Sequence, residues 1–353
     1  GHFDLVGAVW AEKEEVEAIV IAGDLYDRSV PSVEAVALFN EMMVEMNLNK
    51  KYPVLAISGN HDSSTRLETG NHWLKAQQFH LHTRLEQAFE PVEMGDSQFY
   101  LLPYFEPFHA RKYFEDDSLR DIQSSMTAVL AQMKESFEPN KQQILVSHFF
   151  AAGSSRSESE TTLEVGGLDS VPVEMLLDFD YVALGHLHYK DAIKKELKVQ
   201  YSGALLKYSL SEAAQEKGVR VVEVTGEGVS NTFIPIKPLR DVRPLVGAFK
   251  DLVDKDFYDQ QNREDYVAIA LTDETVIENS LHELRQVYPR MISLERVKKE
   301  TTGDNEGQSS EEILKLKPED LVAQYFKENT ENELTKQQKK WLEEAVIEIN
   351  QEK

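Results

Sequence analysis

Polar residues follow four short apolar runs of the sequence, at the point where each run ends. They are Asp24 in IVIAGDLYD, Asn60 and His61 in VLAISGNHD, His148 in ILVSHFF, and His186 with His188 in VALGHLH. Such apolar runs are typical of buried parallel strands, and open parallel sheets gather their ligand sites at the carboxyl ends of the strands. We therefore expect the six side chains to line one pocket.

These residue types are ligands for divalent metal ions. Neutral imidazoles, a carboxylate and an amide oxygen suit manganese, iron or zinc, whereas magnesium and calcium prefer shells made of oxygen alone. Asp24 has two carboxylate oxygens and can bridge two ions. His186 and His188 are two residues apart, so on an extended segment both rings face the same side and each can face a different ion.

Two adjacent metal ions would catalyse phosphoester hydrolysis. Ions about 3.5–4 Å apart clamp a phosphate and lower the pKa of a bridging water, which then attacks in line. His61 directly follows Asn60, so it is placed to donate a proton to the leaving oxygen or to hold the phosphoryl oxygens. The pattern predicts a two-metal phosphoesterase with His61 as its catalytic residue.

Each motif also has a structural explanation when it is taken alone. A Gly-Asp pair often ends a strand because aspartate caps turns and helix starts, and GNHD contains three residues that favour turns. A single histidine such as His148 is more often a packed or surface residue than a ligand. FHLHTR repeats the spacing of GHLH with His80 and His82, but in a more polar context, and we interpret it as structural. Four strand-end motifs in one consistent order favour the metal site.

Alternating helices and strands predict an α/β core between residues 10 and 208. Near-continuous apolar runs, as in parallel strands buried on both faces, occur in VEAIVIAGD, YPVLAISGNHD, QQILVSHFF and FDYVALGHLH. A helix that begins after Ser32 as its N-cap is expected in SVPSVEAVALFNEMMVEMN, because its apolar residues recur at helical spacing. A hairpin-like pair of strands is expected in FEPVEMGDSQFYLLPYF.

The rest of the sequence divides into three parts. Residues 237–300 predict a small α+β domain of two helices and two strands, and residues 301–312 are a polar linker without periodicity. Residues 313–353 predict two amphipathic helices, which either pack on a core of their own or wait for the groove of a partner. Their apolar positions are Leu321, Tyr325, Phe326, Trp341, Leu342, Val346 and Ile349.

Composition limits the kinds of partner. The 353 residues include 38 basic and 62 acidic ones, and the net charge of −24 argues against general attraction to nucleic acid. A substrate that carries phosphate must therefore meet bound cations or local positive charge. There is no cysteine, which excludes thiolate ligands and fits a reducing compartment such as the cytoplasm. No apolar run is long enough for a membrane span, and we expect no membrane partner.

In this order, GDLYDR, GNHD, SHFF and GHLH resemble the calcineurin-like metallophosphoesterases. More narrowly, the chain resembles the SbcD family, the nuclease subunits of bacterial SbcC–SbcD complexes. This narrower likeness rests on IAGDLYDRSVPSVEAV, on YSGALLKYSLSEA with a following Lys-Gly, and on the small domain and tail. The resemblance implies a metallophosphoesterase β-sandwich flanked by helices in residues 1–236, a DNA-capping domain in 237–300, and a helical tail in 313–353.

The resemblance also implies roles for the matching residues. Asp24 would bridge two divalent ions, usually Mn²⁺, and His61 would be catalytic. One ion would be completed by Asn60, His148 and His186, and the other would be bound by His188. The implied activity is double-strand exonuclease and hairpin endonuclease cleavage in DNA repair and recombination, by a homodimer whose tail binds an SbcC-type ATPase. The sequence has no GxxxxGK[ST] loop, so ATP dependence would come from that partner.

The chain departs from the family pattern at one point. The family has an Asp-x-His pair at the end of a first strand, some tens of residues before GDLYD, and this pair would ligate the same ion as His188. His2 and Asp4 in GHFD occur in reversed order and too close to Asp24 to replace it. We therefore expect one nearly complete metal site and one stripped site, and we interpret the start of the chain as absent from this sequence.

Two alternative functions stay open. One is a catalytically impaired subunit that binds DNA ends and bridges an ATPase, which the missing Asp-x-His pair favours. The other is a metallophosphoesterase that acts on a small phosphoester. If DNA is the substrate, Arg66 in SSTRLETGNH and Arg156 in SSRSESE are candidates for contacts with its phosphates. Both segments can also be ordinary polar loops.

Overall fold

The structure is a computed structural model, which describes residues 11, 13–151, 170–194 and 196–297, and residues 322, 326, 333–335 and 337–342 of the tail. The chain divides into two compact units, residues 1–297 and 298–353. The six candidate site residues from Asp24 to His188 lie in the first unit.

The first sheet consists of three parallel strands in sequence order, β1 (Ile19–Ala22), β2 (Val54–Ile57) and β3 (Phe79–His82). One face of this sheet packs against α2 (Val33–Met43), a π-helical turn (Val44–Asn49) and α4 (Asn71–Ala76). Ser32 caps α2 as predicted, because its Oγ accepts a hydrogen bond from the main-chain N–H of Ala35 at 3.2 Å.

The second sheet has five strands in the order β4-β5-β6-β7-β8. They are β4 (Val92–Met94), β5 (Ser97–Leu102), β6 (Gln142–His148), β7 (Tyr181–Gly185) and β8 (Val199–Tyr201). The predicted hairpin is confirmed, because β4 and β5 pair antiparallel, whereas β5 to β8 pair in parallel. The main core covers the outer face of this sheet, under α5 (Pro107–Phe114) and α6 (Ile122–Lys134).

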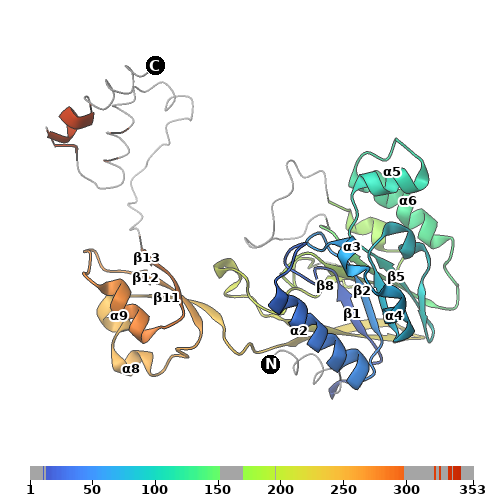
Figure 1. The fold of residues 1–353 in the computed structure, drawn as a ribbon, viewed down its shortest axis with the longest axis horizontal. Coiled ribbons are helices and arrows are strands. Elements are labelled where there is room, and N and C mark those ends of the chain that lie inside the picture. Colours follow the sequence, from blue (N-terminus) through green and yellow to red (C-terminus); the bar gives the residue numbers. More distant parts are fainter. Residues whose placement is uncertain are drawn as a thin grey trace. The chain divides into compact units, whose positions relative to one another are not determined.

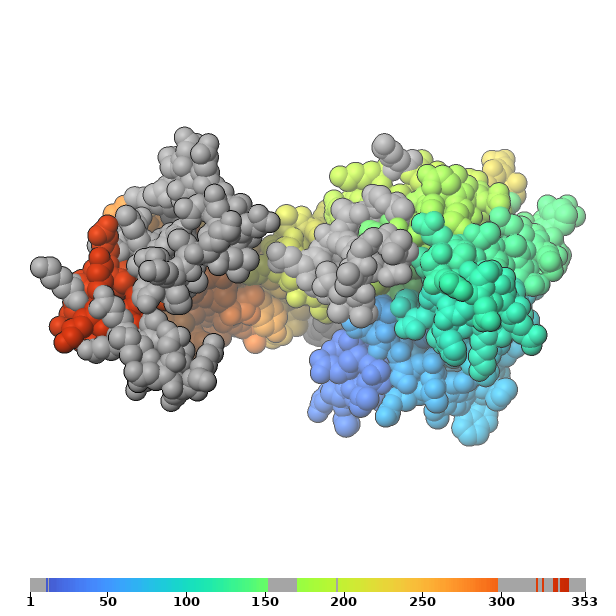
Figure 2. Space-filling model, turned by 90° about the horizontal axis from the view of Figure 1, so that it is seen from above, coloured from blue at the N-terminus to red at the C-terminus, as the bar shows by residue number. Residues whose placement is uncertain are grey.

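The two sheets pack face to face. A separate apolar cluster joins Leu55 and Ile57 of β2 to Leu101 of β5 and Val146 of β6. The layers are thus helix, sheet, sheet and helix, and the predicted α/β sandwich is confirmed (Figure 1). The space-filling view shows residues of both helical layers, the blue residues near α2 and the green residues of α5 and α6 (Figure 2).

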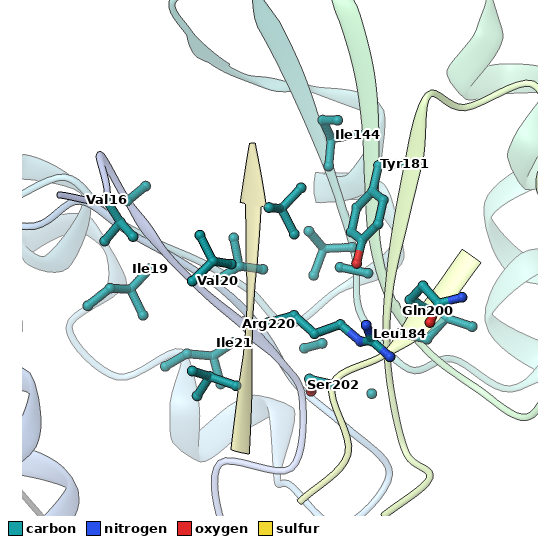
Figure 3. A pocket seen from close by; sticks show the side chains of 18 of the residues that line it. Val16, Ile19, Val20, Ile21, Ile144, Tyr181, Leu184, Gln200, Ser202 and Arg220 are labelled. Carbon is teal, nitrogen blue, oxygen red and sulfur yellow. The ribbon is translucent and has the colours of Figure 1, made fainter. Parts of the chain in front are cut away.

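One strand is less buried than its sequence predicted. The run in β2 is buried throughout, but β1 is only partly buried and Val20 is 39% exposed. In the described part of the chain β1 is an edge strand, and it borders a groove with a volume of about 2470 Å³. Figure 3 shows Val20 and Ile21 on one side of this groove, Tyr181 on the other, and Arg220 extending between them. The prediction of burial on both faces was therefore wrong for β1.

A hairpin closes another part of the groove. It consists of β9 (Gly218–Thr225) and β10 (Gly228–Pro235), which pair antiparallel. Arg220 connects this hairpin to the second sheet, because its Nε donates to the main-chain oxygen of Tyr201 at 2.7 Å. Two 3₁₀ turns, Leu85–Phe89 and Val173–Leu176, support the main core, and a third, Leu210–Glu212, precedes the hairpin.

The segment after the hairpin forms a small domain with its own core, but its elements differ from the prediction. Three parallel strands are present, β11 (Val242–Gly247), β12 (Tyr266–Leu271) and β13 (Met291–Arg296), with α7 (Phe249–Leu252), α8 (Lys255–Tyr258) and α9 (Ser280–Val287). Two strands and two helices were expected. The additional strand arises because the single apolar stretch LVGAFKDLV contains two elements: the chain leaves β11 at Gly247 and starts α7 two residues later.

In the tail, the structure describes a short helix at residues 337–342, and the side chain of Trp341 in this helix is 59% exposed. The linker at 301–312 and the predicted apolar positions Leu321, Tyr325, Val346 and Ile349 lie outside the described residues. Within the residues that the structure describes, no helix is long and apolar enough to cross a membrane.

Candidate metal centre

Asp24 lies on a tight turn at the end of β1. Gly23 and Asp24 both have positive φ, 88° and 51°, so the backbone turns sharply as soon as the strand ends. A Cβ on Gly23 would lie 2.4 Å from Nδ1 of His148, which explains why glycine stands there. The turn brings the Asp24 carboxylate against the end of the second sheet.

His148, at the end of β6, joins the two sheets at this edge. Its Nδ1 donates to the main-chain oxygen of Ala22 at 2.7 Å. Its Nε2 lies 3.2 Å from Oδ2 of Asp24 and 3.0 Å from Oδ1 of Asn60. Nδ1 of His186 lies 3.1 Å from the same Asn60 oxygen, and the rings of His148 and His186 meet edge to face with centroids 5.2 Å apart. Four predicted ligands thus converge on one point.

The donor set fits a cation. Because a main-chain carbonyl only accepts, Nδ1 of His148 carries a proton, and in the neutral ring Nε2 carries the lone pair. That lone pair then faces the Asp24 carboxylate and the Asn60 carbonyl, which are acceptors as well. A shared cation stabilises such a group of acceptors, and nitrogen and oxygen donors of this kind suit manganese, iron or zinc.

The charge of Asp24 agrees with this arrangement. Burial by itself raises the pKa of the Asp24 carboxyl. When the ring of His148 carries a second proton, on Nε2, its hydrogen bond and positive charge, together with the N–H of His61, more than offset that effect. The resulting pKa is below the ordinary value, so Asp24 is ionised at neutral pH.

His61 lies beside this group and is held at two points. Its main-chain N–H donates to Oδ1 of Asp24 at 3.0 Å, and its ring Nδ1 donates to the main-chain oxygen of Asp27 at 2.9 Å. The first bond ties the loop after β2 to the loop after β1. The second fixes the orientation of the imidazole and assigns proton transfer to Nε2.

His188 lines the same groove as Asp24 and His186 but has a different neighbour. Its Nδ1 lies 3.1 Å from Oε1 of Glu212, a fully buried carboxylate, and its ring packs against that of Tyr208 with centroids 5.3 Å apart. His188 therefore has a buried carboxylate as a partner, and its role as a ligand of a second ion stays a prediction.

Asp62 was not among the predicted site residues, although it organises the loops that carry them. Its carboxylate accepts main-chain N–H groups of Leu25 at 3.0 Å, Tyr26 at 3.0 Å and Gly59 at 2.9 Å. Burial raises the pKa of Asp62 even though these bonds oppose the shift. The sequence signal was present in GNHD, where aspartate was interpreted only as a turn residue.

The structure says less about the function of the remaining residues that the sequence pointed to. Arg66 is exposed on α3 (Ser64–Leu67), close in sequence to His61, and Arg156 lies outside the described residues, as do His2 and Asp4. His80 and His82 belong to β3, and the ring of His82 contacts the main-chain oxygen of Leu101 at 3.2 Å. In the described part of the chain, no three His, Asp and Glu side chains by themselves form a group that could hold a metal ion. The cluster around Asp24 is completed by the Asn60 amide.

Comparison with known proteins identifies the family of this chain. The calcineurin-like phosphoesterase family matches residues 1–190, and the family described as the type 5 capsule protein repressor C-terminal domain matches residues 235–330. The SbcD subunit of the SbcCD nuclease from Staphylococcus epidermidis is 35% identical over 93% of this chain and 86% of its own length. The protein of the same name from Staphylococcus saprophyticus is 33% identical over 96% of this chain and 89% of its own. The chain therefore belongs to the calcineurin-like phosphoesterases and, among them, to the SbcD family of SbcCD nuclease subunits.

Proposed function

We propose that this chain is the metal-dependent DNA nuclease subunit of an SbcCD-type complex. The observation that carries the proposal is the convergence of Asp24, Asn60, His148 and His186 from four strand ends. The two relatives named as SbcCD nuclease subunits support DNA as the substrate. A DNA substrate also puts the activity in the compartment that holds the DNA of the cell, which we expect to be the cytoplasm.

Asp24, Asn60, His148 and His186 would hold the first divalent ion, and Asp24 with His188 would contribute to a second. Bound divalent ions, for which we propose Mn²⁺, neutralise the phosphate charge and lower the pKa of a water molecule at the scissile phosphorus. His61 would act on the leaving oxygen. When both of its ring nitrogens are protonated, Nδ1 stays on the oxygen of Asp27 and Nε2 can donate its proton.

The second ion requires more ligands than His188 and Asp24 provide. The groove beside β1 offers a place for them, because β1 is an edge strand among the described residues and its apolar side chains line the groove. We expect calorimetric titration of the protein with Mn²⁺ to show one tight ion, at Asp24, Asn60, His148 and His186. Two equally tight ions would contradict this expectation.

The nuclease function is tested with two substrates. Purified protein, with and without an SbcC-type ATPase, is incubated with hairpin DNA or with p-nitrophenyl phosphate in the presence of Mn²⁺ or EDTA. We expect Mn²⁺-dependent cleavage of the hairpin. Hydrolysis of p-nitrophenyl phosphate alone would favour a small phosphoester as substrate, and DNA binding without cleavage would favour an impaired end-binding subunit.

The tail and the helix α2 are the surfaces that we propose for protein partners. In the tail, Trp341 is largely exposed, as expected of a side chain that enters a groove of the ATPase. Trp341→Ala should abolish co-elution with the ATPase and leave calorimetric binding of Mn²⁺ unchanged. On α2 and the following turn, exposed apolar side chains favour a homodimer, and the residues are Val33, Val36, Leu38, Val44 and Leu48. We expect the variant Leu48→Asp to sediment as a monomer. If it sediments as a dimer, that surface is not the dimer interface.

A further inference from the structure

A buried carboxylate and a buried ammonium group lie behind His188. Oε1 of Glu212 lies 3.1 Å from Nδ1 of His188, and Oε2 of Glu212 lies 2.7 Å from Nζ of Lys217. Nζ of Lys217 in turn donates to the main-chain oxygen of His188 at 2.8 Å. The side chains of Glu212 and Lys217 are 0% and 3% exposed. These contacts form a closed chain that begins and ends on His188.

Burying these two charged groups in the protein costs free energy. Removing a carboxylate and an ammonium group from water is offset only when both are well paired, and an apolar pair of similar volume often fills such a space with equal or greater stability. Glu212 has further partners that reduce the cost, the main-chain N–H of Tyr208 at 3.3 Å and Oγ of Ser209 at 3.5 Å. The ion pair lies directly against a candidate metal ligand, which points to a role beyond packing.

We infer that Glu212 is a positioning residue for His188, a role that rests on the proposed function of His188 as a metal ligand. A carboxylate only accepts, so its contact with Nδ1 requires the ring proton on that nitrogen. The lone pair of His188 is then on Nε2, and a histidine ligand needs one nitrogen in that state. Lys217 fixes the carboxylate from behind and also holds the backbone of His188.

Glu212→Gln tests the inference because it replaces one oxygen with an amide nitrogen at almost constant volume. Lys217 is a donor only, so it will retain the amide oxygen, and the amide nitrogen will then face Nδ1 of His188. Nδ1 must now accept, which moves the ring proton to Nε2. Long-range ¹H–¹⁵N NMR of metal-free, histidine-labelled protein distinguishes the two tautomers. We expect inversion at His188 and no change at His82.

A second variant and a control keep the test decisive if the amide variant fails to fold. Glu212→Asp keeps the negative charge for Lys217, but the shorter side chain withdraws from His188, and we expect a mixture of both tautomers. Glu216→Gln is the matched control, because Glu216 is exposed and contacts Lys190 at 3.8 Å. It should leave the His188 spectrum unchanged. An unchanged tautomer in both Glu212 variants would overturn the inference.

Titration of the same samples with Zn²⁺, a diamagnetic ion that suits the same donors, measures the consequence for metal binding. The midpoint at which Zn²⁺ shifts the Nε2 signal of His188 should rise roughly 10–100-fold in Glu212→Gln, the usual effect of losing a partner of a metal-binding histidine. An inverted tautomer with an unchanged midpoint would refute the positioning role. If Zn²⁺ does not shift the Nε2 signal of His188 in the unchanged protein, the ligand role of His188 is itself refuted. Failure to cleave DNA would count against the proposed function alone, because the tautomer is read without metal or substrate.

Discussion

His148 and Asn60 are 88 residues apart in the sequence, yet Nε2 of His148 lies 3.0 Å from Oδ1 of Asn60. The contact joins the end of β6 to the loop after β2, and so crosses from one sheet of the sandwich to the other. The candidate metal centre therefore depends on how closely the two sheets approach each other at this edge. Substitutions that separate the sheets should damage metal binding without changing any ligand.

Gly185→Ala is the sharpest test of that dependence. A Cβ at residue 185 would lie 1.7 Å from the main-chain oxygen of Ala22 and 2.7 Å from Nδ1 of His148. The backbone must shift, and we expect a loss of about 3 kcal/mol in the free energy of unfolding and weaker Mn²⁺ binding. Urea unfolding and calorimetry measure the two effects. Gly226→Ala is the control, because a Cβ there meets nothing within 4 Å, and equal behaviour of the two variants would contradict the prediction.

His61→Ala should separate catalysis from metal binding. His61 contacts Asp24 through its main-chain N–H, which the substitution retains, whereas its ring is oriented by the main-chain oxygen of Asp27. We expect the rate of hairpin cleavage at saturating substrate to fall roughly 10²–10⁴-fold, with Mn²⁺ affinity preserved. His109→Ala, which alters an exposed histidine of α5, should cleave normally. Normal cleavage by His61→Ala would remove its catalytic role.

Asp62→Asn should disturb the site although Asp62 binds no metal in our proposal. One of the three main-chain N–H groups of Leu25, Tyr26 and Gly59 would then face an amide N–H₂ in place of an oxygen. We expect a loss of roughly 1–3 kcal/mol in the free energy of unfolding and a weaker affinity for Mn²⁺. Asp121→Asn changes the N-cap of α6 and should alter stability alone. Unchanged Mn²⁺ affinity in Asp62→Asn would show that the loops hold their positions without it.

His82 should make the metal-free protein less stable in mild acid. Burial, the largest cause, lowers the pKa of His82 from 6.5 to about 4. The unfolded chain binds the proton first, so the native state loses stability as the pH falls from about 6.5 toward 4. Between pH 7 and pH 5 this amounts to about 2 kcal/mol. Urea unfolding in EDTA should show that His82→Gln lacks this part of the decrease, and an identical pH dependence in both proteins would exclude His82 as its source.

Arg66→Ala should weaken DNA binding by an electrostatic mechanism. Arg66 is exposed on α3, shortly after the loop that carries Asn60 and His61. If it contacts a phosphate, its loss should lower affinity for all sequences and reduce the slope of log K against log salt by about 1. Fluorescence anisotropy with labelled hairpin DNA at several salt concentrations measures both. Arg120→Ala serves as the comparison, and equal slopes for both variants would remove Arg66 from the interface.

The convergence of the candidate ligands was predictable from the sequence because apolar runs identify buried strands and the residues that follow them reach a common edge. The contacts among Asp24, Asn60, His148 and His186 were predicted in this way. Local sequence patterns also predicted the N-cap at Ser32 and the hairpin of β4 and β5 correctly, because both features depend on residues that are close together in the sequence. The strand β11 was missed because its apolar segment continues into α7 without a change of composition.

What the sequence determined by itself is the chemistry of the donors and the α/β order of the elements that carry them. Only the tertiary structure decided which groups support those donors. Asp62, Glu212 and Lys217 act through hydrogen bonds and ion pairs that depend on distances of a few ångströms between segments, and no local pattern encodes such distances. The same reason applies to β1, whose apolar sequence is that of a fully buried strand. Among the residues that the structure describes it lies at the edge of its sheet, and Val20 is exposed to the groove.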